Sequence, residues 1–304
     1  MIWSSKKLRE ERKMTSNSRI TTINSISGGK TSSYIAANYP ADYNVFSLVR
    51  TSDTKCLFPD QKIRQEVSDR LGVEFIGTLE DDAIIYTMLD LEQYIGSKID
   101  WVTGKTFDEI IIRGRKKYLP NVTQRFCTTD MKLKPIFDWW KKNINEVAEV
   151  RIGYRANEQG RAKKMLSKTN EDGVLSFKSV IGKRNGVTNQ NKWAKINWQK
   201  PVFPLIYDNI FRDTIEEYWA DKPVRFAYMN NCIGCFHRNE VLLKLMSDKH
   251  PDKFDWFIRA EQETGYNVRT FKNGVTYERI KNSFKQTQLF ETDFNECDSG
   301  YCGL

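Results

Sequence analysis

The sequence lacks an apolar run long enough to span a bilayer, and its first 19 residues lack the apolar stretch of a secretory signal. We therefore expect a cytoplasmic protein with no membrane partner. Six cysteines in that reducing compartment favour metal or redox chemistry over disulfides. Internal repeats and extended low-complexity segments are also missing, so the 304 residues are expected to form one or two ordinary domains.

Two common phosphate-binding signatures, G-x-x-x-x-G-K-[ST] and G-x-G-x-x-G, are missing at the glycine pair near the N-terminus. The loop found there consists of Ser27, Gly28, Gly29, Lys30, Thr31 and Ser32. It joins an expected strand at 19–26 to an expected helix at 32–39. Adjacent glycines let backbone N–H groups turn toward a ligand, and the helix N-terminus adds partial positive charge. The pattern predicts a phosphate site, with a structural turn as the alternative.

Strand and helix patterns alternate from residue 19 to about residue 155. The further strands are expected at 44–50, 73–76 and 149–153, and the further helices at 61–71, 108–117 and 131–143. This alternation predicts an α/β fold with a Rossmann-like, doubly wound parallel sheet. Ligands of such sheets bind outside the carboxyl ends of the strands. The 27–32 loop lies at such an end, and so do Thr51 and Asp53 after the second strand.

The chain divides into an expected basic arm at 1–18, a nucleotide-binding domain at 19–240 and a helical region with a cysteine-containing tail at 241–304. The net charge is +9, and residues 159–200 hold ten Lys or Arg against two acids. We interpret 159–200 as a basic insertion, a hairpin with short strands at 175–181 and 193–198. Such a face suits a polyanion or a small phosphorylated nucleotide, and a solvated charged loop is the alternative.

Four further segments follow the 27–32 loop in order. They lie at 126–135, 152–161, 201–205 and 231–235. With the loop, this ordered set resembles the PAPS (phosphoadenosine phosphosulfate) reductase-like family of the PP-loop ATP pyrophosphatases, the adenine nucleotide alpha hydrolase-like superfamily. The resemblance covers most of residues 20–240. It implies an enzyme that binds ATP or PAPS, with Mg²⁺, at the 27–32 loop and at Thr51 and Asp53.

Arg155, Glu158 and Arg161 belong to the second of these segments. Guanidinium groups bind phosphate oxygens bidentately, so the two arginines can hold the outer phosphates or the sulfate of the nucleotide. Glu158 can orient them or help to hold Mg²⁺. Lys30 has a catalytic role by its place inside the loop. A surface ion-pair cluster is the alternative for the 155–161 residues.

Cys232 and Cys235 form a C-x-x-C pair that is common in zinc and iron–sulfur sites. By resemblance to sulfur-transfer enzymes and adenylylsulfate reductases of this fold, the pair and Cys127 hold a [4Fe–4S] cluster. The reductases have adjacent cysteines where this chain has Cys127 and a threonine. The fourth ligand is therefore Cys302 or Cys297, or the fourth iron is open and carries sulfur. Structural zinc is the alternative.

The tail contains Cys297 after a glutamate and Cys302 before a terminal Gly-Leu. The assimilatory reductases of the family end in Glu-Cys-Gly-[Leu/Ile]-His, and their cysteine attacks the sulfate sulfur. This tail resembles that ending, with an insertion between its halves and without the histidine. The resemblance implies that Cys297 or Cys302 is a catalytic nucleophile. A cluster ligand and an idle thiol are the alternatives.

Three functions stay open. In the first, ATP activates an oxygen of a nucleic-acid acceptor as an adenylate, and sulfur from a cluster or a cysteine persulfide displaces AMP. In the second, a tail cysteine attacks PAPS or adenylylsulfate, and a thioredoxin releases sulfite. In the third, the chain is a non-catalytic nucleotide- or nucleic-acid-binding module. The cysteine set and the basic insertion favour the first, with a cysteine desulfurase as donor and a homodimer as an expected assembly.

The remaining cysteine, histidines and tryptophans are expected to serve packing. Cys56 is expected in the core or lining a pocket, His250 at a helix end, and His237 is a weak ligand candidate. Six of the eight tryptophans are expected to pack in the core or in loops rather than to stack on bases; they are Trp139, Trp140, Trp193, Trp198, Trp219 and Trp256.

Overall fold

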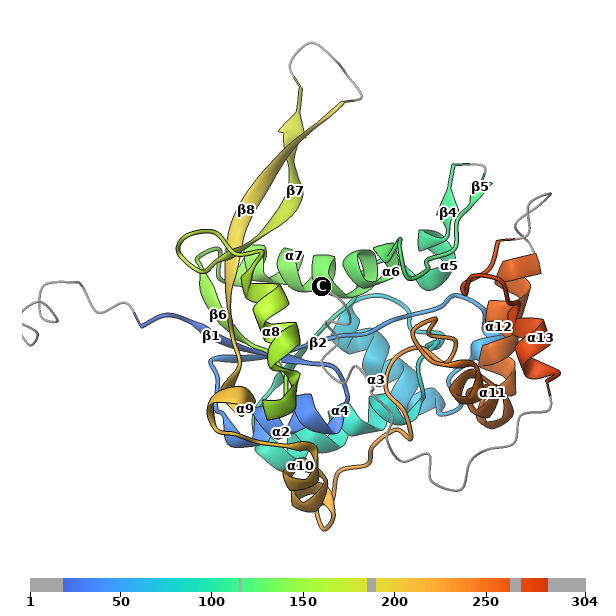
Figure 1. Cartoon of the computed structure of the whole chain (residues 1–304), viewed down its shortest axis with the longest axis horizontal. Coiled ribbons are helices and arrows are strands. Elements are labelled where there is room, and N and C mark those ends of the chain that lie inside the picture. The colour runs from blue at the N-terminus through green and yellow to red at the C-terminus, as the bar shows by residue number, and fades with distance from the viewer. Residues whose placement is uncertain (1–18, 115, 185–189, 263–268, 284–304) are drawn as a thin grey trace, which may run out of the picture.

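The computed structural model describes residues 19–114, 116–184, 190–262 and 269–283. Its centre is a six-stranded sheet in the order β3-β2-β1-β6-β8-β7, in which only β7 is antiparallel to its neighbour (Figure 1). The strands are β1 (Thr22–Ile26), β2 (Tyr43–Ser47), β3 (Ile99–Val102), β6 (Ala148–Arg151), β7 (Leu175–Lys183) and β8 (Asn191–Val202). The chain is therefore an α/β protein with a mostly parallel sheet, compatible with the expected Rossmann-like fold.

Helices cover both faces of the sheet because its central strands bury apolar side chains on both sides. Ile26 and Phe46 point to one face and pack against α2 (Lys30–Asn38) and α4 (Ala83–Ile95). Ile23 and Val45 point to the other face and pack against α7 (Lys134–Asn143) and α8 (Gln159–Leu166). In the ranges that the structure describes, no helix is long and apolar enough to cross a membrane.

The direction of winding reverses between β1 and β6. From β1 the chain proceeds to β2 and β3 on one side, and from β6 to β8 on the other. The loops that follow β1 and β6 therefore start at the same edge of the sheet, where no crossover helix separates them. This reversal point is where open parallel sheets bind their ligands.

The third strand of the sheet is β3, and the expected strand at 73–76 is wrong. Phe58 N donates to Ile76 O, and a single bridge joins Thr51 to Gly77, so this stretch is extended without joining a ladder. The strand comes later, after α4, a helix that the sequence reading did not predict. In β3 the side chains alternate between buried and half-buried, as its Ile-Asp-Trp-Val sequence favours.

The expected helix at 108–117 is also wrong. The chain forms only the single turn α5 (Phe107–Ile110), which starts at a capping box between Thr106 and Glu109. The chain then continues into β4 (Ile112–Arg113), which pairs antiparallel with β5 (Lys116–Lys117), and Gly114 between them has φ +63°. Glycine adopts this left-handed conformation readily and disfavours a helix interior, so it suits the turn between the two strands rather than the expected helix.

The other described elements link these layers. They are α3 (Gln61–Leu71), 3₁₀ turns at Thr54–Cys56 and Ala156–Glu158, α6 (Phe126–Thr128) continued by a π-helical turn (Thr129–Leu133), α9 (Pro204–Tyr207) and α10 (Arg212–Trp219). The π-helical turn leads directly into α7, so the helix expected at 131–143 is confirmed with a distorted first turn.

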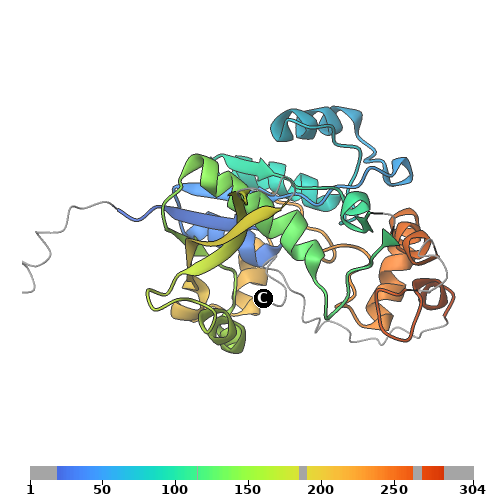
Figure 2. The ribbon, with the colours of Figure 1, turned by 90° about the horizontal axis from the view of Figure 1, so that it is seen from above.

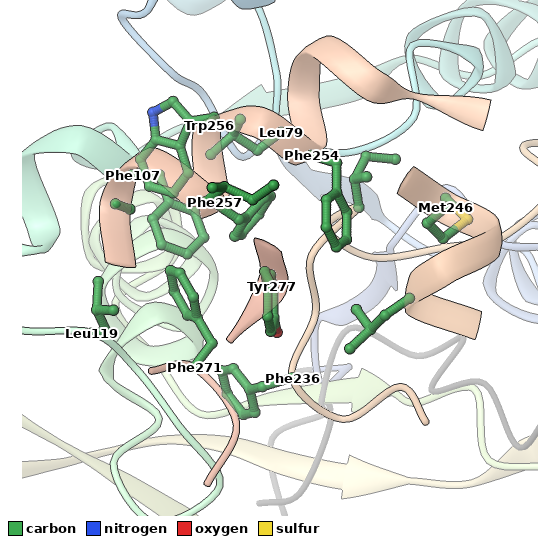
Figure 3. Packing of buried hydrophobic residues seen from close by; sticks show 14 of the residues in the cluster. Leu79, Phe107, Leu119, Phe236, Met246, Phe254, Trp256, Phe257, Phe271 and Tyr277 are labelled. Atoms are coloured by element: carbon green, nitrogen blue, oxygen red, sulfur yellow. The ribbon is translucent and has the colours of Figure 1, made fainter. Parts of the chain in front are cut away.

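The helices α11 (Glu240–Lys249), α12 (Pro251–Gln262) and α13 (Tyr277–Lys281) lie together at one side of the sheet (Figures 1 and 2). Their core is aromatic: Phe257 packs against Phe271 and Phe107, with ring centroids 5.3 and 5.8 Å apart (Figure 3). Leu79 belongs to the same buried cluster, so the C-terminal helices share their core with the first half of the chain. The expected tail with Cys297 and Cys302, like the arm at 1–18, lies outside the described residues.

The strands expected at 175–181 and 193–198 are confirmed as β7 and β8, which form a hairpin that projects beyond the sheet (Figure 1). On one face of the hairpin, Phe177 stacks on Phe137 of α7 at 4.6 Å and Trp198 is buried. Trp193 lies on the opposite face and is 52 % exposed, so the expectation that it packs in the core or in a loop is wrong. Of the five other tryptophans for which packing was expected, Trp139 is half-buried and the rest are buried.

Replacing Trp198 by alanine is expected to lower the free energy of unfolding by about 3–5 kcal/mol, because it removes a buried ring from a packed site. Trp198 lies 5.7 Å from Phe137 and 5.9 Å from Trp140 between ring centroids. Trp193→Ala, on the same strand, is the matched control and should change the value by about 0.5 kcal/mol or less. Urea unfolding measures both, and equal losses would contradict the packing described for β8.

Candidate functional site

The 27–32 loop follows β1 directly and is held by its own side chains. Gly28 has φ +83°, and Gly29 is the N-cap of α2. Ser27 N donates to the Ser32 hydroxyl at 3.1 Å, and that hydroxyl donates to Gly29 O at 3.1 Å. The loop therefore has a fixed shape, and the positive end of a nine-residue helix lies behind it.

The loop after β6 lies against the 27–32 loop. A Cβ on Gly153 would lie 3.3 Å from the Thr31 methyl group, so the backbones approach closely here. Two residues later, Arg155 begins a 3₁₀ turn. The reversal point of the sheet thus brings Lys30 and Arg155 to one place, as the sequence predicted for ligands of such sheets.

A cavity of about 520 Å³ lies between these loops and α10. We call it the anion cavity, since it has three cationic side chains and one carboxylate; its charged lining residues are Lys30, Arg155, Arg212 and Glu216. Its size is within the range of small-ligand pockets. Trp219, Phe226 and Tyr228 add aromatic surface on which a planar ring could stack.

Helix α10 positions Lys30, which the sequence reading did not foresee. The Lys30 ammonium group forms an ion pair with Glu216, and Trp219 Nε1 donates to Lys30 O at 3.0 Å. Arg212 lies one turn before Glu216, with 3.9 Å between their charged atoms. In sequence this i, i+4 pair is indistinguishable from a solvated helix face, so no signal pointed to the cavity.

Glu158 lies between the two arginines of its segment. Its Oε2 accepts hydrogen bonds from Arg155 N at 2.9 Å and Arg155 Nε at 3.1 Å, and its Oε1 pairs with Arg161. The Arg161 guanidinium also covers the Tyr154 ring at 4.3 Å. Glu158 thus contacts both arginines, and Arg155 is the one of the two that lines the anion cavity.

Thr51 and Asp53 are not brought to the anion cavity. Asp53 forms an ion pair with Arg259 of α12, and Thr51 Oγ1 donates to Asp108 at 2.7 Å. Asp53, Asp108 and Arg259 line a separate cavity instead. The segment between the end of β2 and Thr51 carries these residues toward the C-terminal helices, which strand prediction alone could not show.

A second cavity, which we call the thiol cavity, brings three cysteines together. Cys127 comes from α6, and Cys232 and Cys235 come from the turn after residue 230. Cys235 N donates to Cys232 O at 3.0 Å, which closes the turn. Burial raises the pKa of Cys127 to about 11, with a further contribution from Cys235. Burial also raises the pKa of Cys232 well above its usual value, and Glu80 adds to the effect.

The donor set of the thiol cavity suits soft metals. Thiolate ligands select zinc and iron–sulfur clusters, and the three expected cysteine ligands share this cavity. Among the described residues, no three His, Cys, Asp or Glu side chains are already grouped so that they could hold a metal ion. The fourth candidates, Cys302 and Cys297, lie outside those residues.

His237 also lines the thiol cavity. Burial lowers the pKa of its imidazole to about 4, and Arg125 and Lys272 contribute to the shift. The ring is therefore neutral at pH 7, which is the form that can bind a metal. By contrast, Cys56 is buried in the core as expected, and His250 ends α11 beside the Asp81 carboxylate at 3.4 Å.

The two cavities adjoin each other. Asn230 lines the anion cavity, and the next residue, Asn231, lines the thiol cavity. Arg125 lies on the thiol side, where burial lowers the pKa of its guanidinium while Cys127 and Cys235 act to raise it. Within the described part of the chain, its buried Nε has no hydrogen-bond partner. Buried donors are rarely left unsatisfied, so Arg125 is a candidate ligand-binding group that the sequence reading missed.

Comparison of the chain with protein-family models, curated protein sequences and solved structures gives no match. Function therefore has to be argued from the residues and the geometry of the two cavities. The arrangement offers cations and backbone donors for a phosphorylated ligand beside a cavity lined by three half-buried cysteines.

Gly28→Ala is expected to destabilise the fold and the loop together, because its Cβ would lie 2.6 Å from Ile84 Cγ2 of α4. We expect a loss of about 2–4 kcal/mol in the free energy of unfolding, from left-handed strain plus overpacking. Gly72→Ala is the control, since Gly72 has φ +67° but nothing within 4 Å of its Cβ position. It should lose only about 1 kcal/mol. Equal losses in denaturant unfolding would contradict the close approach of the loop to α4.

Proposed function

We propose that this chain is an adenine-nucleotide-dependent sulfur-transfer enzyme of the PAPS reductase-like family, with the PP-loop fold and a basic insertion at 159–200. Its acceptor is a nucleic acid. The observation that carries the proposal is the pairing of the two cavities: the 27–32 loop and Arg155 flank the anion cavity, and the thiol cavity adjoins it through Asn230 and Asn231.

The nucleotide binds at the reversal point of the sheet. The backbone of the 27–32 loop and the N-terminus of α2 receive the β- and γ-phosphates of ATP. Lys30 and Arg155 neutralise their charge, and Arg155 is held in position by Glu158. Mg²⁺ would enter with the nucleotide as Mg–ATP and would help to neutralise the phosphate charge. In this proposal Lys30 exchanges Glu216 for a phosphate oxygen, so Glu216 holds the lysine in place before the nucleotide arrives.

The first step is adenylation of the acceptor. A carbonyl oxygen of the acceptor attacks the α-phosphorus of ATP, the bond from that phosphorus to the bridging oxygen breaks, and pyrophosphate leaves with the bond's electron pair. Lys30 and Arg155 stabilise the charge that develops on the leaving pyrophosphate. The acceptor oxygen now belongs to a good leaving group, AMP.

The second step replaces that oxygen by sulfur. The terminal sulfur of a cysteine persulfide attacks the activated carbon, and AMP leaves. A second thiol attacks the sulfur–sulfur bond, which frees the thiolated acceptor and leaves a disulfide that a thioredoxin-class dithiol reduces. A cysteine desulfurase supplies the persulfide sulfur. Three clustered thiols, Cys127, Cys232 and Cys235, match this need for sulfur carriers next to the nucleotide.

The same cysteines are the ligands that a [4Fe–4S] cluster would use, with Cys302 or Cys297 as the fourth. Such a cluster would supply a bound sulfide in place of the persulfide. Arg125, with its buried Nε, would position the adenylated acceptor between the cavities.

Lys30→Ala is expected to weaken ATP binding at least about tenfold, because a charge-assisted contact to phosphate contributes about 1.5–3 kcal/mol. Lys62→Ala, an exposed lysine on α3, is the matched control and should leave affinity unchanged. Isothermal titration with Mg–ATP measures both. Unchanged affinity in Lys30→Ala would exclude the proposed nucleotide site.

The metal content of anaerobically purified protein tests the thiol cavity. We expect about four iron and four sulfide per chain, with a broad visible absorption, lost in Cys232→Ser. Cys56→Ser is the control and should keep both, because Cys56 belongs to the core. Zinc in place of iron would contradict the cluster.

Sulfite release from PAPS that depends on Cys297 or Cys302 would favour the reductase function over sulfur transfer.

A further inference from the structure

The β7–β8 hairpin carries positive charge without any acidic residue. From 174 to 200 the sequence contains six Lys or Arg and no Asp or Glu. The hairpin projects away from the sheet (Figure 1). Of these six residues, Lys200 lies beside β6 and pairs with Glu149 at 3.8 Å. A projecting element of one charge sign is an electrostatic footprint for a polyanion.

The two faces of the hairpin differ. Phe177 and Ile196 are partly buried and pack against the hydrophobic cluster on the α7 side of the sheet. The cross-strand pairs Lys178 with Lys195 and Val180 with Trp193 lie on the outer face, because paired residues share a face and alternate with the inner set. The inner face is used for folding, and the outer face is left for solvent or a partner.

Trp193 is the unusual residue of the outer face. Its side chain is 52 % exposed, and the Lys178 ammonium group lies 5.6 Å from its ring centroid. Trp198, on the same strand, is buried in the core, whereas the exposed ring of Trp193 contributes nothing to it. The ring is available for a planar ligand.

One surface groove collects these features. It is lined by Lys178, Lys183, Arg184, Lys192 and Trp193. Four cations around one aromatic ring match a chain of phosphates with a base between them. An acidic peptide would satisfy the cations but not the ring, and an apolar partner would satisfy the ring but not the cations.

We propose that the outer face of the β7–β8 hairpin binds a nucleic-acid strand at an unpaired base. Trp193 stacks on that base, and the lysines and Arg184 contact the flanking phosphates. This inference rests on the proposed function, since it gives the surface by which the nucleic-acid acceptor is held. It also selects the acceptor class: single-stranded segments, loops or bulges, in which a base can leave its stack.

The test is direct binding without ATP. Fluorescence anisotropy of a labelled single-stranded oligonucleotide, as RNA and as DNA, and of a matched duplex gives affinity as a function of salt. We expect the single strand to bind more tightly than the duplex. Trp193→Ala should weaken single-strand binding about tenfold while leaving the salt slope unchanged, because stacking carries no charge.

The dependence of the binding constant on salt concentration tests whether the hairpin lysines contact phosphates. For a single strand, each lost phosphate contact should reduce the slope of log K against log salt by about 0.7, so Lys178→Ala with Lys192→Ala should reduce it by about 1.4. Lys62→Ala on α3 removes the same charge elsewhere and should leave the slope unchanged. Trp193→Ala is expected to fold normally, which urea unfolding checks.

Three outcomes would overturn the inference: Trp193→Ala binds like the unaltered chain, Lys62→Ala reduces the slope as much as a hairpin lysine does, or polyglutamate competes as well as the oligonucleotide. None of them bears on the nucleotide site. Mg–ATP affinity should be the same in all hairpin variants, and a failure of Lys30→Ala to lose ATP would leave the oligonucleotide result intact.

Discussion

The close approach of two loops at the reversal point of the sheet is the constraint on which the candidate site depends. β1 and β6 are parallel neighbours, so their following loops leave from one edge, and Gly153 lies against Thr31 because neither loop has a bulky side chain there. A left-handed Gly28 lets the first loop pass under Ile84 of α4. With both backbones in place, Lys30 and Arg155 face one cavity, and the cations there are balanced by Glu158 and Glu216 rather than left facing each other.

The thiol cavity follows from a different constraint, the shared aromatic core of the C-terminal helices. A Cβ on Gly234 would lie 2.5–2.7 Å from the Phe257 ring, so only glycine lets the turn between Cys232 and Cys235 lie on α12. That contact holds two thiols against the α6 segment that carries Cys127. Burial raises the pKa of Cys127 and of Cys232, so these two thiols are protonated at neutral pH, and a metal bound there would have to displace their protons.

The hairpin illustrates how one strand can serve two purposes. β8 enters the parallel sheet beside β6 at its carboxyl end and pairs only with β7 at its amino end. Period-two alternation sends Trp198 and Ile196 into the core and Trp193 and Lys195 outward. Anchoring by the inner face keeps the outer face fixed relative to the site, so a strand bound there would be held at a defined place on the same molecule.

The sequence by itself determined what depends on local patterns. The glycine pair between an apolar strand and a helix, the alternation of elements, and the basic stretch before residue 200 predicted the α/β class, the 27–32 loop and the hairpin. It misplaced the third strand and the 108–117 helix, because a short extended segment and a true strand look alike until pairing is known. Only the tertiary structure decided which distant residues meet: Glu216 at Lys30, Arg259 at Asp53 and Arg125 beside the thiols. Those contacts join elements far apart in the chain, and they arise from how helices pack on a sheet, which no local pattern encodes.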